Sequence, residues 1–81
     1  MKANNKNRNI ALEFSEDEAI VFLEWLHNFN EQERPTLFQD QSEERILFDL
    51  EAELEKVVSA TFKSNYHEVL SNARQKIRNE E

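Results

Sequence analysis

The sequence predicts a mostly α-helical protein of the α+β class, with one N-terminal β-strand at about 9–14 followed by three helices at about 16–29, 41–60 and 66–78. Three observations lead to this prediction. Apolar residues recur at helical spacing in three long segments. A side chain that can cap a helix precedes each of these segments. The alternation that is typical of a strand occurs only ahead of the first segment.

The predicted strand is Ile10–Phe14, in which Ile10, Leu12 and Phe14 share one face. A strand cannot stand alone, because its backbone N–H and C=O groups need a partner. Two partners are open at this point: a second copy of the chain, or a short second strand formed by Thr36-Leu37-Phe38.

The first helix is expected to begin at a capping box, in which Ser15 accepts from the third helical N–H and Glu18 reaches back. An apolar stripe follows it: Ala19, Phe22, Leu23, Leu26 and Phe29. Val21 and Trp25 widen this stripe to about 200°, which is too wide for one neighbouring element, while Ile20 is expected on the polar side.

Asp40 is the expected N-cap of the second helix, with Glu43 completing the box and Arg45 able to pair with Asp49 or Glu44. Asn65 is expected to cap the third helix. The inner face of the second helix is expected to contain Leu47, Leu50, Leu54, Val57 and Val58, and that of the third Tyr66, Val69, Leu70, Ala73 and Ile77.

The composition sets limits on size and chemistry. A chain of 81 residues is expected to form one small domain, 1–81, with frayed ends at about 1–8 and 79–81. Cysteine is absent, which excludes disulfides and thiolate chemistry, and glycine is absent, which excludes Gly-rich phosphate loops. No apolar run is long enough to span a membrane, so we expect a cytoplasmic protein that does not associate with membranes.

Negative charge is concentrated in the middle of the chain. Residues 13–55 contain fourteen acidic and two basic residues, a net charge of −12 within a chain of −7. An acidic block of this kind is usually a solvated surface that keeps a small protein soluble. The alternative interpretation is an acidic surface that docks a basic protein partner. Nucleic-acid binding is not expected, because the basic residues are confined to the two short ends of the chain.

The residues that could support catalysis do not form a recognised pattern. His27 has Glu24 and Glu31 one turn away on either side, a spacing that can orient an imidazole or hold a metal but that also fits a solvent-facing histidine. His67 is expected at the surface. The second helix contains many carboxylates, so pairs such as Asp49 and Glu53 are expected by coincidence. No motif marks one pair for acid-base chemistry or for cation binding. We therefore predict no enzyme, with no catalytic, cofactor-binding or metal-binding residue and no cofactor.

Apolar surface that three helices cannot hide among themselves indicates an interface. Aromatic residues are typical anchors of such surfaces. The candidate interface residues are Ile10, Leu12, Phe14, Val21, Trp25 and Phe48. The predicted function is a small non-enzymatic interaction or regulatory module that acts as a homodimer. The alternative is an acidic antitoxin-like or immunity-like protein that neutralises a basic partner.

The stretch Phe38–Glu51, together with the preceding capped helix and Asn65-Tyr66, resembles an uncharacterised family of small acidic bacterial proteins of unknown function. The resemblance covers most of the chain. It implies a bacterial, cytoplasmic protein, and it implies no activity, cofactor or site.

Overall fold

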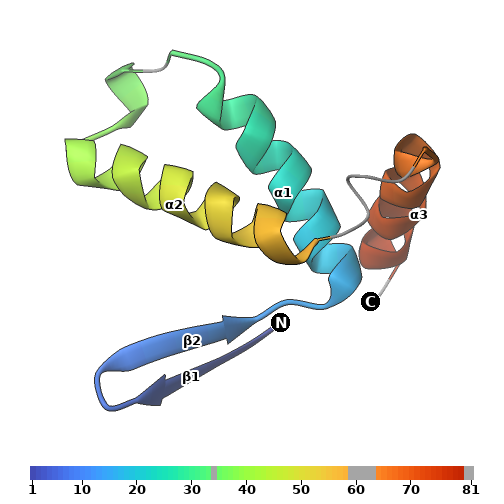
Figure 1. The fold of residues 1–81 in the computed structure, drawn as a ribbon, viewed down its shortest axis with the longest axis horizontal. Helices are drawn as coiled ribbons and strands as arrows, with labels where there is room; N and C mark the ends of the chain where they lie inside the picture. The colour runs from blue at the N-terminus through green and yellow to red at the C-terminus, as the bar shows by residue number, and fades with distance from the viewer. Residues whose placement is uncertain (34, 59–63, 80–81) are drawn as a thin grey trace.

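The structure of the protein is a computed structural model that describes residues 1–33, 35–58 and 64–79. Within these ranges the elements are β1 (Lys2–Lys6), β2 (Asn9–Glu13), α1 (Glu16–Asn30), a 3₁₀ turn η1 (Pro35–Leu37), α2 (Gln41–Val57) and α3 (Tyr66–Arg78). Figure 1 shows α1 between the other two helices, with the strands extending away from them. The predicted α+β class with mainly helical structure is confirmed.

The prediction of a single strand was wrong by one strand. β1 and β2 form an antiparallel hairpin in which Lys2 lies opposite Glu13 and Lys6 lies opposite Asn9. The turn consists of Asn7 and Arg8, whose φ angles of 53° and 71° are those of a type I′ turn. The segment that was expected to be a frayed end, about 1–8, therefore contains a strand. Sequence patterns missed it because Lys and Asn are disfavoured in strands and the turn has no glycine.

The strand β1, and not the suggested segment Thr36-Leu37-Phe38, pairs with β2 within the described part of the chain. Thr36 and Leu37 belong to η1 and therefore have helical backbone. Proline at the first position of that turn suits a helical conformation, because its ring holds φ near −65°. Pairing of β2 thus does not require a second copy of the chain.

The capping box predicted at the start of α1 is present. The Glu18 backbone N–H donates to Ser15 Oγ at 3.1 Å, and the Ser15 backbone N–H donates to the Glu18 carboxylate at 2.8 Å. Two backbone donors that the helix leaves free are satisfied in this way. The first helix therefore begins at Glu16, where the sequence predicted it.

The helix α2 begins as predicted, with a small change in its cap. The Asp40 carboxylate accepts from the Ser42 N–H at 2.8 Å, whereas Glu43 accepts from Gln39 rather than from Asp40. The helix ends at Val57, before the predicted end near 60, because Val58 has extended backbone. Residues 59 and 60 lie outside the described residues.

The helix α3 coincides with the prediction, Tyr66–Arg78. Asn65 occupies the N-cap position, but within the described residues its side chain makes no capping hydrogen bond. Lys76 and Arg78 in the last turn complement the negative end of the helix dipole. Of the predicted frayed end at 79–81, residues 80 and 81 lie outside the described residues.

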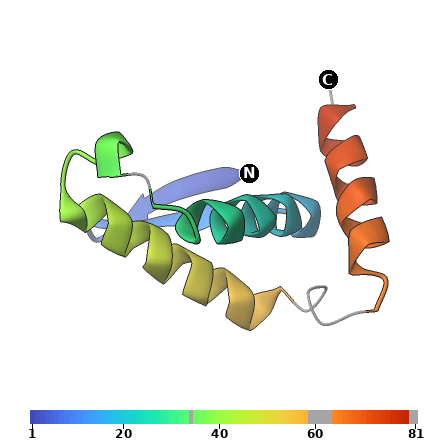
Figure 2. The ribbon, with the colours of Figure 1, turned by 90° about the horizontal axis from the view of Figure 1, so that it is seen from above.

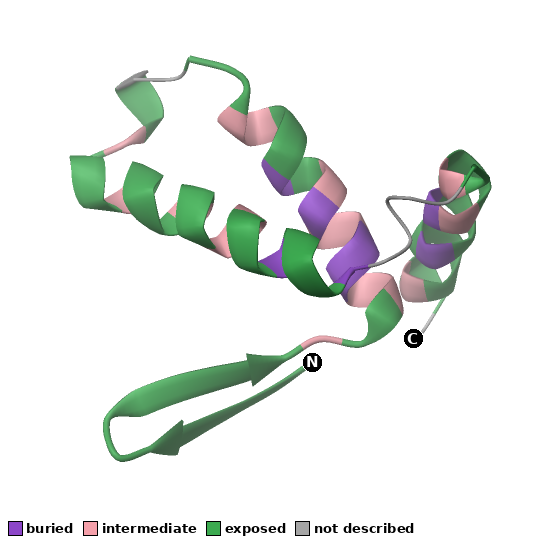
Figure 3. Cartoon of the chain, in the orientation of Figure 1, coloured by how far each residue is buried: buried purple, intermediate pink, exposed green. Residues whose placement is uncertain are grey.

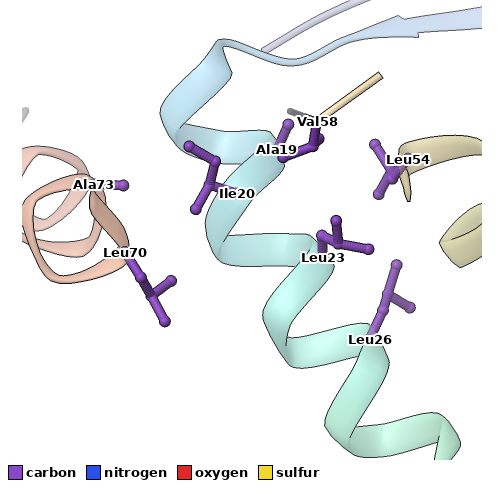
Figure 4. Close-up of a cluster of buried hydrophobic side chains, with 8 residues drawn as sticks. All are labelled: Ala19, Ile20, Leu23, Leu26, Leu54, Val58, Leu70 and Ala73. Carbon is purple, nitrogen blue, oxygen red and sulfur yellow. The ribbon is translucent and has the colours of Figure 1, made fainter. Parts of the chain in front are cut away.

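The core forms where α1 meets both neighbouring helices (Figure 4). Its buried side chains are Ala19, Ile20, Leu23, Leu26, Leu54, Val58, Leu70 and Ala73. Ile20 is only 3% exposed, so its prediction on the polar side was wrong. The reason is that α3 packs on that side, with Leu70 and Ala73 beside Ile20 (Figure 4). Val57, which was expected on the inner face of α2, is exposed.

The hairpin lies outside this core. All residues of β1 and β2 are exposed (Figure 3). Figures 1 and 2 together place the hairpin on one side of the pair formed by α1 and α2, with α3 across the N-terminal half of α1. Phe14, which follows β2, packs against the core and connects the hairpin to α1.

Candidate functional site

A groove of about 560 Å³ opens where the hairpin meets α1. We call it the aromatic groove. It is lined by Met1, Leu12, Phe14, Glu18, Val21, Phe22, Trp25, Leu50 and Ile77. These residues come from the hairpin, the connection to α1 and all three helices, so the groove exists only when the chain is folded. Its lining is apolar except at Glu18 and at the amino group of Met1.

A row of stacked rings forms the α1 side of the groove. Phe14 stacks on Phe22 with centroids 5.7 Å apart, and Phe22 stacks on Trp25 at 6.2 Å. The row continues beyond the groove, where Trp25 stacks on Phe29 at 4.9 Å and Phe29 meets the edge of Phe38 at 6.0 Å. The helix places these rings together because Phe22, Trp25 and Phe29 are three and four residues apart. Such ring pairs attract one another, so the stacking favours this arrangement of the groove wall.

Three residues of the groove are more than half exposed. Met1 at the start of the chain is 69% exposed, Leu12 on the hairpin 55% and Trp25 on α1 52%. A single exposed apolar residue is ordinary, but a contiguous apolar surface is typical of a binding site. Met1, Leu12 and Trp25 are therefore the residues of the groove that a partner would cover most.

Trp25 also borders a second, smaller hollow of about 330 Å³. This hollow shares Val21 and Trp25 with the aromatic groove, and Arg74 of α3 lies at its edge. Trp25 thus stands on the ridge between two depressions. Trp beside Arg is a frequent combination in protein interfaces.

The structure brings four of the six candidate interface residues together. Leu12, Phe14, Val21 and Trp25 all line the aromatic groove. Ile10 is exposed on the same face of β2 as Leu12, farther out along the hairpin.

The sixth candidate, Phe48, is 44% exposed on α2. It is not among the described residues that line the groove, so the structure does not join it to the four candidates that do.

The sequence did not assign Phe22, Leu50 or Ile77 to this surface, because all three were expected on inner helix faces. Each is in fact half-buried and lines the groove, and Phe22 and Leu50 also pack against the core. The spacing of Phe22, Trp25 and Phe29 is the signal that could have indicated an aromatic row. No sequence pattern could show that α2 and α3 approach this row.

Glu18 is the charged side chain of the groove, and the structure surrounds it with donors. Its carboxylate lies 3.1 Å from the Met1 amino group and accepts the Ser15 N–H of the capping box. The backbone hydrogen bond from Ser15 and the interaction with the amino group lower the pKa of Glu18 below its ordinary value. The Glu18 carboxylate therefore stays ionised, and its negative charge is balanced by the positive charge of the Met1 amino group.

A second cluster of polar side chains lies along the contact between α1 and α2. We call it the His27 cluster, and its members are His27, Asn30, Glu31, Glu51 and Glu55. His27 Nδ1 lies 3.0 Å from Glu51 Oε2, and His27 Nε2 lies 3.1 Å from Glu31 Oε1. The Asn30 amide donates to the other Glu51 oxygen, Oε1, at 2.7 Å.

These contacts shift three pKa values. The hydrogen bond to Glu51, reinforced by the charge of Glu31, raises the pKa of His27. Partial burial opposes ionisation of Glu51, but hydrogen bonds from Asn30 and His27 outweigh it and lower the pKa of Glu51. The hydrogen bond with Glu51 raises the pKa of Glu55, because two neighbouring carboxylates share a proton more readily than they both ionise.

The predicted surroundings of His27 were half right. Glu31 contacts His27 as the spacing suggested, but Glu24 instead accepts a hydrogen bond from the Tyr66 hydroxyl at 3.2 Å. The carboxylates of α2 approach from the other helix, which spacing within one helix cannot reveal. Asp49 and Glu53, considered earlier as an acidic pair, contact Arg45 and Lys56 respectively.

None of the helices in the described part of the chain has the length and apolar character needed to cross a membrane. Comparisons with protein-family models, with curated proteins and with solved structures found no match.

Proposed function

We propose that the chain is a small non-enzymatic interaction or regulatory module that acts as a homodimer, with the aromatic groove as its self-association surface. The observation that carries the proposal is the contiguity of the groove, in which Leu12 and Trp25 are both more than half exposed. A cytoplasmic location in a bacterium belongs to the same proposal.

The low charge of the groove is compatible with a second copy as the occupant. Two chains of net charge −7 repel one another, so their contact must avoid facing carboxylates. The groove meets this requirement, because Glu18 already pairs with the Met1 amino group and the remaining lining is apolar. A two-fold dimer needs a self-complementary patch, and an apolar patch with a protruding indole satisfies that need.

Sedimentation at low micromolar concentration tests the proposal. We expect a species of twice the 9.7 kDa chain mass, and Trp25→Glu should weaken association by at least about 30-fold, as expected for a central interface tryptophan. Ile46→Glu is the matched control, because Ile46 is an exposed apolar residue of α2 that does not line the groove. A wild-type chain that sediments only at 9.7 kDa would overturn the proposal.

Fluorescence gives an independent reading from the same site, since Trp25 is the single tryptophan of the sequence. Covering its exposed half by a second copy should shift its emission to shorter wavelength as the protein concentration rises. Emission that is independent of concentration while the chain dimerises would place the interface elsewhere.

The alternative function is neutralisation of a basic protein, as antitoxin-like and immunity-like proteins do. It is favoured by carboxylates that are exposed on three separate elements, Glu13 on β2, Glu16 on α1 and Glu44 on α2. This alternative predicts a defined basic partner that is retained at low salt, released at high salt and bound equally well by Trp25→Glu. A partner lost with Trp25→Glu would contradict it.

A further inference from the structure

Three side chains of the His27 cluster can each offer one ligand atom to a metal ion. Ligand atoms of His27, Glu51 and Glu55 all lie within 4.8 Å of one another. We propose that these three side chains bind a Zn²⁺ ion that bridges α1 and α2, with His27 coordinating through Nδ1.

One ligand pair, His27 and Glu51, already has a separation close to the one that zinc requires. Zinc binds imidazole nitrogen and carboxylate oxygen at about 2.0–2.2 Å, so tetrahedral ligand atoms are about 3.4 Å apart. His27 Nδ1 and Glu51 Oε2 are 3.0 Å apart, which is near this value. Glu55 is exposed on the next turn of the same helix, so rotation of its side chain can bring its carboxylate within range.

Hydrogen bonds orient two of the three ligands. Glu31 accepts at His27 Nε2, which leaves Nδ1 to face the carboxylates of α2. Asn30 donates to Glu51 Oε1, which leaves Oε2 for the metal. A carboxylate behind a histidine ligand is the usual support in zinc sites, where it fixes the ring and strengthens its basicity.

The ligand types select the metal. One imidazole with two carboxylates suits Zn²⁺, and a water would complete four-coordination. Mg²⁺ prefers six oxygen ligands and binds imidazole poorly, so it should not compete. A doubly charged ion would also relieve the repulsion between the neighbouring carboxylates of Glu51 and Glu55.

The site is separate from the aromatic groove. His27 follows Trp25 by two residues, which places the two side chains on nearly opposite sides of α1. Zinc binding is therefore independent of the proposed self-association. Its consequence is structural: the ion joins helices whose ligands are 24 residues apart in sequence and opposes their separation.

Calorimetry and thermal unfolding with Zn²⁺ as the probe test the proposal. We expect one Zn²⁺ per chain and a rise in Tm of roughly 10–20 °C at zinc concentrations about 100-fold above Kd. His27→Gln should weaken binding by at least about tenfold, and Glu31→Gln should weaken it less. His67→Gln is the matched control, because His67 is an exposed histidine outside the cluster, and it should leave the affinity unchanged.

Nuclear magnetic resonance of the wild-type chain keeps the test independent of any variant. Zn²⁺ should shift the ring nitrogen signals of His27 and leave those of His67 in place. The proposal is overturned if zinc does not bind at about 0.1 mM, if His27→Gln binds zinc as the wild type does, or if Mg²⁺ competes equally. Trp25→Glu should bind zinc normally, so failure of the dimer and failure of the metal site are distinguishable.

Discussion

The two apolar faces of α1 differ in what covers them. Leu23 and Leu26 are buried against neighbouring helices, and Leu26 is fully enclosed. Trp25, adjacent to Leu26 in sequence, is 52% exposed above the aromatic groove. The sequence makes both faces hydrophobic, and the difference arises because α2 and α3 cover one face whereas the hairpin only borders the other.

This contrast separates the residues that hold the fold from those available to a partner. Burial of the first face stabilises the monomer through transfer of apolar surface from water. The second face keeps part of its apolar surface in water, so that free energy can be gained only on association. The first prediction compares these two faces directly.

The largest expected effect is the loss of stability on Leu26→Ala. Removing a fully buried leucine costs about 3 kcal/mol of unfolding free energy, because the enclosed site leaves a cavity. Trp25→Ala should cost only about 1 kcal/mol in the monomer, although it removes more atoms, since half of the side chain is already in water. Urea unfolding below the association range measures both. Equal costs would show that the two faces do not differ energetically.

The next effect concerns the cap that begins α1 and thereby orients both faces. Ser15→Ala removes the oxygen that accepts the Glu18 N–H and should reduce the unfolding free energy by about 1 kcal/mol. Ser71→Ala is the control, because Ser71 is an exposed residue inside α3, where alanine is a slightly better helix former. Comparable losses in the two variants would argue against a specific role of the cap.

The same cap predicts a pH dependence at the edge of the groove. The hydrogen bond from Ser15 and the nearby amino group lower the pKa of folded Glu18, so the unfolded chain binds the proton more tightly. The resulting stabilisation is present above the unfolded pKa and is lost as pH falls through the folded pKa. Glu18→Gln should therefore flatten the acid part of a plot of unfolding free energy against pH. An acid limb as steep as that of the wild type would contradict the prediction.

The smallest expected effect is a gain in stability at the hairpin turn. Arg8 has a φ of 71°, a left-handed conformation that a side chain disfavours and glycine accepts readily. Arg8→Gly creates an Asn-Gly pair, the preferred type I′ turn, and should raise the unfolding free energy by about 0.5–1 kcal/mol. Arg8→Ala also removes the charge but keeps the conformational cost, so it should not stabilise. A gain in both variants would point to charge instead of turn conformation.

The helices were predictable because their signals are local. The Ser15 capping box, the Asp40 cap and the apolar spacing located α1, α2 and α3 closely, apart from the end of α2. The strand β1 was not predictable, because its polar residues have little strand preference of their own. It pairs because β2 offers a hydrogen-bonding edge and Asn7-Arg8 can turn the chain back.

The candidate site was predictable in part for the same reason. The over-wide apolar stripe of the first helix indicated Val21 and Trp25, and alternation along the strand indicated Leu12 and Phe14. Phe48 and Ile10 satisfied the same patterns but lie away from the groove. The meeting of His27 with Glu51 and Glu55 joins residues from two helices, and spacing along one helix carries no information about it.

Local physics thus set where each helix begins, which residues are apolar and how much negative charge the surface must expose. Caps, side-chain spacing and charge act over a few residues, so they can be read from the chain. Packing settled which apolar face of α1 is covered, that Ile20 is buried, and that a groove rather than an isolated strand is left open. These outcomes depend on how α2, α3 and the hairpin share the surface of one helix, and that competition involves contacts between residues far apart in sequence.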